Sequence, residues 1–296
     1  MVDKHILLVA QVVREHLNDP NWVLVDCRSD LSDREFGRRS YTENHIPGAV
    51  FLDLDKDLAG PVAPETGRHP LPPVKSIVAA LGAVGIENSS NVVVYDQSNG
   101  GIAARAWWIL RWLGHESVYL LDGGFSRWQR LGFPLEAGEV ARHLTRYRES
   151  SGVTRVLTTA ELEANLDKLR EHKLLDARDR QRFLGRHEPI DPVAGHVPGA
   201  ISLPFAEFVR EDGTWLPLQE RAVLLENVLG PDRNVNWSVM CGSGVTACHL
   251  AITGIEAGYK EPRLYVGSWS EWIRDPRRPI GTGAGPEWGQ QTADLG

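Results

Sequence analysis

Cysteine is scarce in this sequence of 296 residues, and the few cysteines form no pairing pattern. There are three, Cys27, Cys241 and Cys248, and none belongs to a CxxC pair. An odd, sparse set excludes a disulfide framework and offers no metal-ligand spacing. We therefore expect reduced thiols, a cytoplasmic protein and neither a metal nor another cofactor. A cysteine in such a chain is a candidate nucleophile.

Basic residues are also fewer than acidic ones. The chain carries 32 Lys and Arg residues against 39 Asp and Glu residues, a formal net charge of −7, and it has no dense basic run. Both halves are acidic. This balance argues against nucleic acid and against an anionic membrane surface as partners. A small anionic substrate stays compatible, because one site can be positive on an acidic protein.

Long apolar runs are missing. The first twenty residues, MVDKHILLVAQVVREHLNDP, include an apolar stretch that Asp3, Lys4 and Arg14 interrupt. The stretch is therefore not a secretory signal peptide, and no segment reaches the length of a transmembrane helix. We expect no membrane association.

The chain repeats itself. Three segments of the first half recur in the same order in the second half, displaced by 144 to 151 residues. The pairs are WVLVDCR (22–28) with KLLDAR (173–178), NHIPGAVFLDL (44–54) with GHVPGAISLPF (195–205), and LLDGGFSRW (120–128) with LYVGSWSEW (264–272). A shared order at nearly one displacement indicates a tandem duplication.

Each half alternates short apolar strands with helical patterns, which predicts an α/β fold with a mostly parallel sheet flanked by helices. The predicted strands are WVLVD, NVVVYD and SVYLLD in the first half and KLLDA, NWSVM and RLYVG in the second. The predicted helices include PPVKSIVAALGAVG, IAARAWWILRWLG and AELEANLDKLREH. The expected division is a first domain at 1–135, a linker at 136–154, a second domain at 155–280 and a surface or disordered tail at 281–296.

One cysteine stands in a glycine-rich turn, MCGSGVTACH (240–249), between a predicted strand and a predicted helix. Gly242 and Gly244 permit the dihedral angles of an anion-binding nest of backbone amides, and the following helix adds the positive end of its dipole. Hydroxyls of Ser243 and Thr246 can donate further hydrogen bonds. The turn would therefore stabilise the thiolate of Cys241. The alternative role of a cysteine is that of a small buried hydrophobic residue, and we expect this role for Cys27 and Cys248.

The duplication supplies an internal control. The first half has VVVYDQSNGGIAARAWW where the second has WSVMCGSGVTACHLA, so Asp96 stands where Cys241 stands. A carboxylate cannot act as a thiol nucleophile. We therefore expect the first copy to be catalytically silent and to form a wall or lid over the site.

Together, CGSGVTA (241–247), the paired HIPGA and HVPGA segments and GSWSEW (267–272) resemble the tandem-domain rhodaneses, the 3-mercaptopyruvate and thiosulfate sulfurtransferases. The resemblance implies two rhodanese-like domains with the active site in the second. It also implies that Cys241 takes a sulfane sulfur from a small anionic donor as a persulfide. A thiol or cyanide then accepts the sulfur, with a thioredoxin-like reductant as a further partner.

The resemblance also assigns the remaining site residues. Ser243 would relay a proton, and Arg182 would hold the carboxylate of the donor. The further substrate-binding residues are Gly242, Gly244, Val245, Thr246, Arg186 and His45, although His45 serves equally well as a turn-holding residue. Neutral residues after Cys241 favour 3-mercaptopyruvate as the donor. The segment HEPIDP (187–192) departs from the mercaptopyruvate pattern, so thiosulfate stays an alternative donor.

Two other classes compete with this interpretation. Dual-specificity phosphatases also place a cysteine loop after a strand, but they need an arginine six residues later, where this chain has Ala247. Phosphatase activity is therefore disfavoured. A sulfur carrier without turnover is compatible with an intact Cys241, and only a sulfur-transfer assay separates it from an enzyme.

Overall fold

The structure, a computed structural model, describes residues 5–150, 152 and 154–284, and each half of the chain builds one parallel sheet. The first sheet has the order β1-β5-β4-β2-β3. Its strands are β1 (Leu7–Leu8), β2 (Trp22–Asp26), β3 (Val50–Phe51), β4 (Asn91–Tyr95) and β5 (Val118–Leu121). Every strand pair in it is parallel.

The second sheet repeats this order as β6-β10-β9-β7-β8, again with parallel pairs throughout. Its strands are β6 (Arg155–Leu157), β7 (Lys173–Asp176), β8 (Ile201–Ser202), β9 (Trp237–Met240) and β10 (Arg263–Tyr265). The predicted α/β fold is confirmed. The six predicted strands are the three inner strands of each sheet, where apolar residues must face helices on both sides.

Helices flank both sheets. In the first half they are α1 (Ala10–Glu15), α2 (Phe36–Glu43), α3 (Val74–Ala83), α4 (Ala103–Trp112) and α5 (Gly124–Arg130). In the second half they are α6 (Thr159–Glu163), α7 (Arg180–Phe183), α8 (Leu218–Leu229), α9 (Ala247–Glu256) and α10 (Ser268–Trp272). Short 3₁₀ turns cover Leu166–Lys168 and Phe205–Phe208.

One predicted helix is wrong in length. The pattern at 160–172 predicts a continuous helix, but α6 ends at Glu163 and a 3₁₀ turn follows. The Asn165 side chain donates a hydrogen bond of 2.7 Å to the carbonyl of Glu161 and so closes the helix. Because the asparagine side chain competes with the backbone for hydrogen bonds in this way, asparagine has a low helix propensity.

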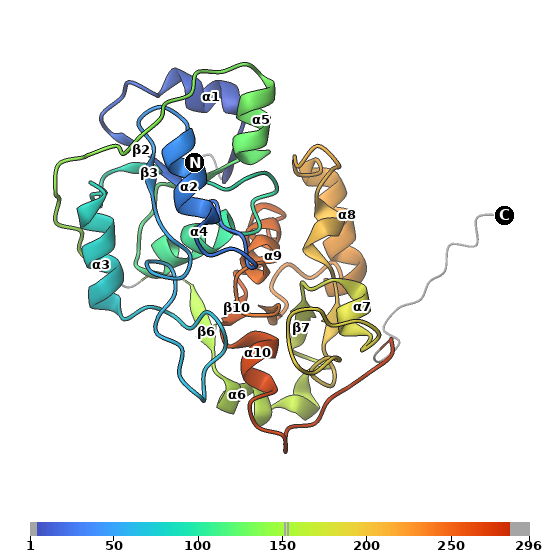
Figure 1. Ribbon diagram of the computed structural model, residues 1–296. Coiled ribbons are helices and arrows are strands. Elements are labelled where there is room, and N and C mark those ends of the chain that lie inside the picture. The colour runs from blue at the N-terminus through green and yellow to red at the C-terminus, as the bar shows by residue number, and fades with distance from the viewer. Residues whose placement is uncertain (1–4, 151, 153, 285–296) are drawn as a thin grey trace.

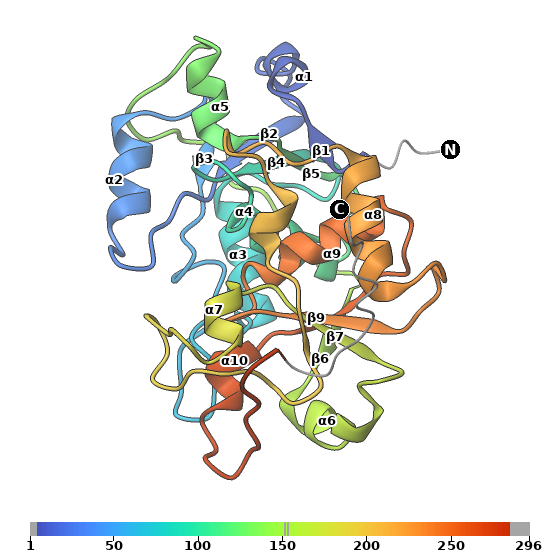
Figure 2. The same cartoon turned by 90° about the vertical axis from the view of Figure 1, so that its right-hand side faces the viewer.

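The two halves pack against each other, with α4 and α9 at the centre of the molecule (Figures 1 and 2). One continuous apolar core takes buried side chains from both halves, including Trp107 and Leu250. Polar contacts add to it, since Arg127 lies 3.2 Å from Asp212 of the other half. This packing brings first-half loops against the carboxyl ends of the second sheet.

The predicted linker, of which residues 151 and 153 lie outside the described residues, runs along the first half. The amide of Thr145 donates to Gly82 at 2.9 Å and that of Ser150 to Leu113 at 3.0 Å. Of the predicted tail, residues 281–284 are described, and Gly281 pairs with His196 through two backbone hydrogen bonds. The rest of the tail lies outside the described residues. The boundaries themselves stay a prediction.

No helix in the described part of the chain has the length and apolar character needed to cross a membrane.

Candidate active site

Cys241 lies at the carboxyl end of β9 and just before α9, the edge at which parallel α/β sheets bind ligands. It is buried, and its carbonyl accepts the amide of Trp269 at 3.0 Å, while the next carbonyl, that of Gly242, accepts the amide of Ser270 at 2.9 Å. Helix α10 thereby draws the loop carbonyls outward. Within the described chain, no hydrogen bond uses the amides of residues 242–246, which are free to donate to an anion.

The loop glycines are required by their surroundings. Gly244 has φ +76, and a Cβ there would lie 2.4 Å from the carbonyl oxygen of Val266. A Cβ on Gly242 would lie 2.8 Å from Nη2 of Arg68. Any side chain at either position would displace the loop or a guanidinium.

The first-half loop shows an anion bound in the equivalent place. The Asp96 carboxylate accepts backbone amides at 2.8 to 3.1 Å. The donors are Ser98, Gly100, Ile102 and Ala103. The backbone hydrogen bonds on the outer side of the loop also repeat. The amides of Phe125 and Ser126 donate to the carbonyls of Asp96 and Gln97. In the second half, the amides of Trp269 and Ser270 donate to the carbonyls of Cys241 and Gly242 in the same way. A loop of this design can therefore surround negative charge with amides.

A hydrogen-bonded chain from the first half reaches the loop at Ser243. Nδ1 of His69 lies 2.7 Å from Oγ of Ser243, and its Nε2 lies 3.3 Å from Oδ1 of Asp55. Burial, with the positive charge of Arg105 nearby, lowers the pKa of His69 to about 4. The imidazole is thus neutral at pH 7, and a carboxylate at Nε2 favours the tautomer whose Nδ1 accepts a proton.

Arg105 of α4 supports the loop from behind. Its fully buried guanidinium donates to the carbonyl of Gly244 at 3.1 Å and to those of His69, at 3.1 Å, and Leu58, at 3.3 Å. Within the described residues, no carboxylate lies within ion-pairing distance of it. Burial lowers the pKa of Arg105, although its ordinary value is so high that the group stays charged. An unpaired positive charge therefore lies behind Cys241.

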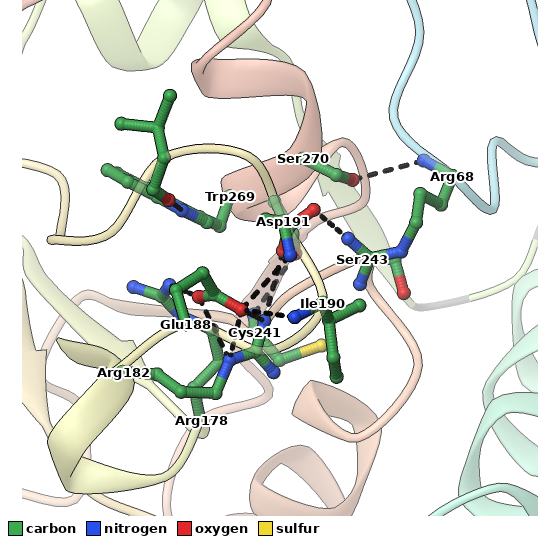
Figure 3. A network of polar contacts seen from close by, with 12 residues as sticks. Arg68, Arg178, Arg182, Glu188, Ile190, Asp191, Cys241, Ser243, Trp269 and Ser270 are labelled. Carbon is green, nitrogen blue, oxygen red and sulfur yellow. Dashed lines mark hydrogen bonds and ion pairs between the residues drawn. The ribbon is translucent and has the colours of Figure 1, made fainter. Parts of the chain in front are cut away.

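The predicted substrate arginine lies beside the loop but is already engaged. A Cβ on Gly242 would lie 3.4 Å from Nη2 of Arg182. Its Nε donates to Glu188 at 2.9 Å, and its Nη2 donates to Asp191 at 3.0 Å. Figure 3 shows Asp191 between Arg182 and Arg68, with which it also forms an ion pair. Arg182 is thus one of two cations at this place.

Neighbouring groups fix the strand end beside this cluster. Nε of Arg178 donates to both oxygens of Asp176 at 3.1 and 3.0 Å, and its Nη2 donates to Gly195 at 2.7 Å. The guanidinium lies 4.7 Å from the ring centre of Trp269. Trp269 is itself fully buried, so it packs beneath the site and does not line an open pocket.

The other predicted substrate residues differ in place. Val245 is buried, and Thr246 is the residue before α9, so both belong to the loop. Arg186 is exposed, and its backbone amide donates to Gln181. Cys27 and Cys248 are both buried thiols, and burial raises their pKa values.

The structure places His45 in a packing role rather than at the loop. Its ring stacks on Tyr41 with 4.3 Å between centres, its Nδ1 contacts the carbonyl of Tyr41 at 2.8 Å, and its backbone pairs with Glu136. His196 repeats this arrangement on Phe183 and Gly281. This geometry does not support a substrate-binding His45 and favours the turn-holding alternative.

Besides Arg105 of α4, two first-half residues reach the loop from a segment that the repeat does not cover. Arg68 and His69 belong to the connection between β3 and α3, which is longer than the one between β8 and α8. The available signal was extra length in the first half without a counterpart in the second, because an added segment in a duplicated fold can serve a purpose outside the shared core.

The described residues also enclose a cavity of about 570 Å³, lined by residues that include Arg155, Trp237 and Arg263. It lies at the amino ends of β6, β9 and β10, the edge opposite to Cys241. Since ligands of parallel sheets bind at the carboxyl ends, we place the chemistry at Cys241 and not in this cavity.

Comparison with known proteins shows the family of both halves. A family model described as rhodanese-like domain matches residues 9–131 and again 158–275. The chain is 46% identical over 282 residues to a probable 3-mercaptopyruvate sulfurtransferase of Pseudomonas aeruginosa, covering 94% of this chain and 98% of that one. It is 38% identical to SseB of Mycobacterium tuberculosis, named a putative thiosulfate sulfurtransferase, over 88% of this chain and 90% of that one.

Solved structures agree as well. The crystal structure of SseA from Escherichia coli, described among 3-mercaptopyruvate sulfotransferases, matches with a TM-score of 0.79 and 30% identity. The match covers 90% of this chain and 99% of SseA. The names of the relatives divide between two sulfur donors, so the donor has to be argued from the site.

Proposed function

Because the chain belongs to the rhodanese family and is a sulfurtransferase, we propose that Cys241 carries the transferred sulfur as a persulfide and that 3-mercaptopyruvate is its preferred donor. The Cys241 thiolate attacks the donor sulfur, an S–S bond forms and the carbon–sulfur bond of the donor breaks. The electron pair of the broken bond leaves with the three-carbon fragment as an enolate. The free loop amides and the buried charge of Arg105 stabilise the thiolate before this step and the anionic persulfide after it.

Proton transfer distinguishes the two candidate donors. With thiosulfate, the outer sulfur passes to Cys241, the S–S bond of the donor breaks and sulfite leaves with its electron pair, without any proton moving. With 3-mercaptopyruvate, the donor thiol loses a proton and the enolate carbon gains one, which completes pyruvate. The Ser243–His69–Asp55 chain can hold and return that proton, because neutral His69 is a base within 2.7 Å of the hydroxyl. This chain is the observation that carries the donor assignment.

A second reaction returns the enzyme to its starting state. A thiol or cyanide attacks the outer sulfur, the S–S bond breaks and Cys241 leaves as thiolate. A thioredoxin-like dithiol is a suitable acceptor, since its second thiol can release the sulfur as sulfide. We place the reaction in the cytoplasm, where such thiols are kept reduced.

Steady-state transfer from both donors to cyanide tests the proposal. We expect His69→Asn and Ser243→Ala to lower kcat/KM for 3-mercaptopyruvate about 100-fold, the usual size of an acid–base contribution. Transfer from thiosulfate should fall less than about threefold, because no proton moves. Equal losses with both donors would show that the chain supports the loop only.

Mass spectrometry checks the intermediate. The protein incubated with either donor should gain one sulfur atom on Cys241, and Cys241→Ser should gain none. Cys248→Ser, which alters a buried thiol on the following helix, is the matched control and should keep the gain. A persulfide that forms without turnover to any acceptor would indicate a sulfur carrier instead.

Thiosulfate is the second candidate donor, and one observation favours it. Arg68 joins Arg182 over Gly242, so two guanidiniums rather than one lie beside the sulfur-transfer site. A pair of cations suits an anion with two charges. The charge of this cluster therefore decides how well each donor binds.

A further inference from the structure

Asp191 lies at the centre of the cation pair beside Cys241. One of its carboxylate oxygens pairs with Nη1 of Arg68, and the other lies 3.0 Å from Nη2 of Arg182. Its side chain is 3% exposed, against 25% for Arg68 and 12% for Arg182. The carboxylate thus bridges the two guanidiniums from the buried side (Figure 3).

The first half fixes one member of this pair. The backbone amide of Arg68 donates to Oγ of Ser270 in α10 at 3.0 Å, and the preceding residue, Gly67, is packed against the carbonyl of Gly267. These contacts hold the Arg68 backbone on the second domain. Its guanidinium then lies within van der Waals distance of Gly242, the neighbour of the nucleophile.

The charges in the cluster balance. Arg68 and Arg182 supply two positive charges, and Asp191 and Glu188 supply two negative ones, while Arg178 is paired with Asp176. Burial opposes the ionisation of Glu188, but hydrogen bonds from Arg182 outweigh it and hold its pKa below the usual value. Glu188 is therefore a permanent partner of Arg182.

Asp191 is less firmly ionised than Glu188. Burial raises its pKa, and Arg68 only partly opposes this shift. Its two oxygens accept hydrogen bonds from Nη1 of Arg68 and Nη2 of Arg182, so part of the hydrogen-bonding capacity of both guanidiniums is already used. An incoming donor anion meets this internal anion first.

We infer that Arg68 and Arg182 together hold the anionic group of the donor and that Asp191 is the specificity-determining residue that limits this group to a single negative charge. The inference rests on the proposed function, since it concerns the donor of the same Cys241 reaction. Because the Asp191 carboxylate stays in place between the two guanidiniums, a monoanionic 2-oxo carboxylate adds one negative charge to the balanced cluster. A dianion such as thiosulfate leaves a larger excess of negative charge in a partly buried place, where charge is poorly screened.

The Asp191→Asn variant tests the inference. Asparagine keeps the shape but removes the charge. We expect KM to fall about tenfold for thiosulfate and only about threefold for 3-mercaptopyruvate, with kcat changed less than twofold, so that the preference between donors moves toward the dianion. Asp212→Asn is the matched control, because Asp212 also pairs with an arginine of the other half but lies away from Cys241, and it should leave both KM values unchanged.

Arg68→Gln provides a second measurement if the first variant does not fold. It removes the first-half cation and should raise KM for both donors about tenfold, with thiosulfate affected more. An equal change of KM for both donors in Asp191→Asn, or a rise for both, would overturn the inference while leaving Cys241 transfer intact. Absence of sulfur transfer from either donor in the unaltered protein would instead overturn the proposed function.

Discussion

At the scale of single residues, Ser268 shows how a strained backbone serves the site. It is the residue other than glycine that has a positive φ in the described chain, at +53, a conformation that costs about 1 kcal/mol in an ordinary side chain. Its first-half counterpart is Gly124, with φ +54. Oγ of Ser268 accepts the amide of Cys241 at 3.0 Å and donates to Tyr265 at 2.8 Å. The hydroxyl therefore compensates for the strain.

Two substitutions at Ser268 should separate strain from hydrogen bonding. Ser268→Ala keeps the strain and leaves the Cys241 amide without its partner, so we expect a loss of about 1–2 kcal/mol in the free energy of unfolding. Ser268→Gly relieves the strain as well, so its net loss should be below about 1 kcal/mol. Denaturant unfolding measures both. A glycine variant less stable than the alanine variant would contradict this account.

The sequence indicated Cys241 and its loop as candidates more readily than it indicated the residues that surround them. Cys241, Ser243 and Arg182 are local to motifs, so pattern and resemblance place them. His69, Arg68 and Arg105 come from the other half, and their proximity to the loop depends on how two domains pack. Spacing along the chain carries no information on that packing. The family resemblance indicated His45 as a substrate residue, whereas the repeat of its motif at His196 favours a turn-holding role.

At the scale of secondary-structure elements, α4 and α9 form the link between the silent loop and the reactive one. Arg105 projects from α4 and binds the carbonyl of Gly244 just before α9. The charged groups that face Cys241 and its loop are Arg105, and Arg68 and Arg182 at Gly242, while neutral His69 faces Ser243. Of these, Arg105 is the fully buried one without a carboxylate partner in the described chain.

Loss of this charge should make Cys241 a slower nucleophile. In Arg105→Met we expect alkylation of Cys241 by iodoacetamide at neutral pH to slow about tenfold, because a nearby positive charge stabilises a sulfur anion. Arg105→Lys keeps the charge and should stay close to the unaltered protein. The measurement is the time course of alkylation of the Cys241 peptide, followed by mass spectrometry.

Arg221→Met is the control for removing a buried arginine. Arg221 has its own partner, Glu256, at 2.7 Å, and lies on α8 rather than at the loop. Its loss should destabilise the protein without changing the alkylation rate. An unchanged rate in Arg105→Met would show that the loop amides alone stabilise the thiolate.

Elements were predictable where they are long or buried on both faces. The inner strands and helices α3, α4 and α9 follow from apolar runs and helical periodicity. The edge strands β1, β3, β6 and β8 have two or three residues each, too few for any pattern. They form because a longer neighbour offers free hydrogen-bonding groups, which is a property of the assembled sheet.

At the scale of the whole molecule, buried histidines couple stability to pH. Burial lowers the pKa values of His69, His115, His196 and His249. Between pH 6.5, the ordinary value, and about 4, the value of His69, the unfolded chain binds protons that the native protein excludes. The free energy of unfolding must therefore fall as pH falls through this window.

His249 is the clearest test of this coupling. Its ring stacks on Trp215 with 3.5 Å between centres, and neither ring nitrogen has a hydrogen-bond partner within the described chain. His249→Phe keeps the stacking and removes the titration. We expect the loss of unfolding free energy between pH 6.5 and 4.5 to shrink by about 2 kcal/mol. His187→Gln, an exposed control, should leave the slope unchanged.

The duplication was visible in the sequence, and with it the number and type of domains. The contribution of the first half to the Cys241 loop was not, because it comes from the lengthened connection between β3 and α3 and from a side chain of α4 whose contacts depend on how the two halves pack. The expectation of a wall or lid understates the first half, which places His69, Arg68 and Arg105 against the loop of the second half.

The Asp96 loop has a consequence for the rate of sulfur exchange. In this loop, four backbone amides surround the side-chain carboxyl group of Asp96, which is part of the chain, at hydrogen-bonding distance. In the reaction proposed for Cys241, thiolate and persulfide carry the same single charge. The cycle thus runs between two states of equal charge in a cradle that keeps its orientation, so little reorganisation energy accompanies the passage of sulfur.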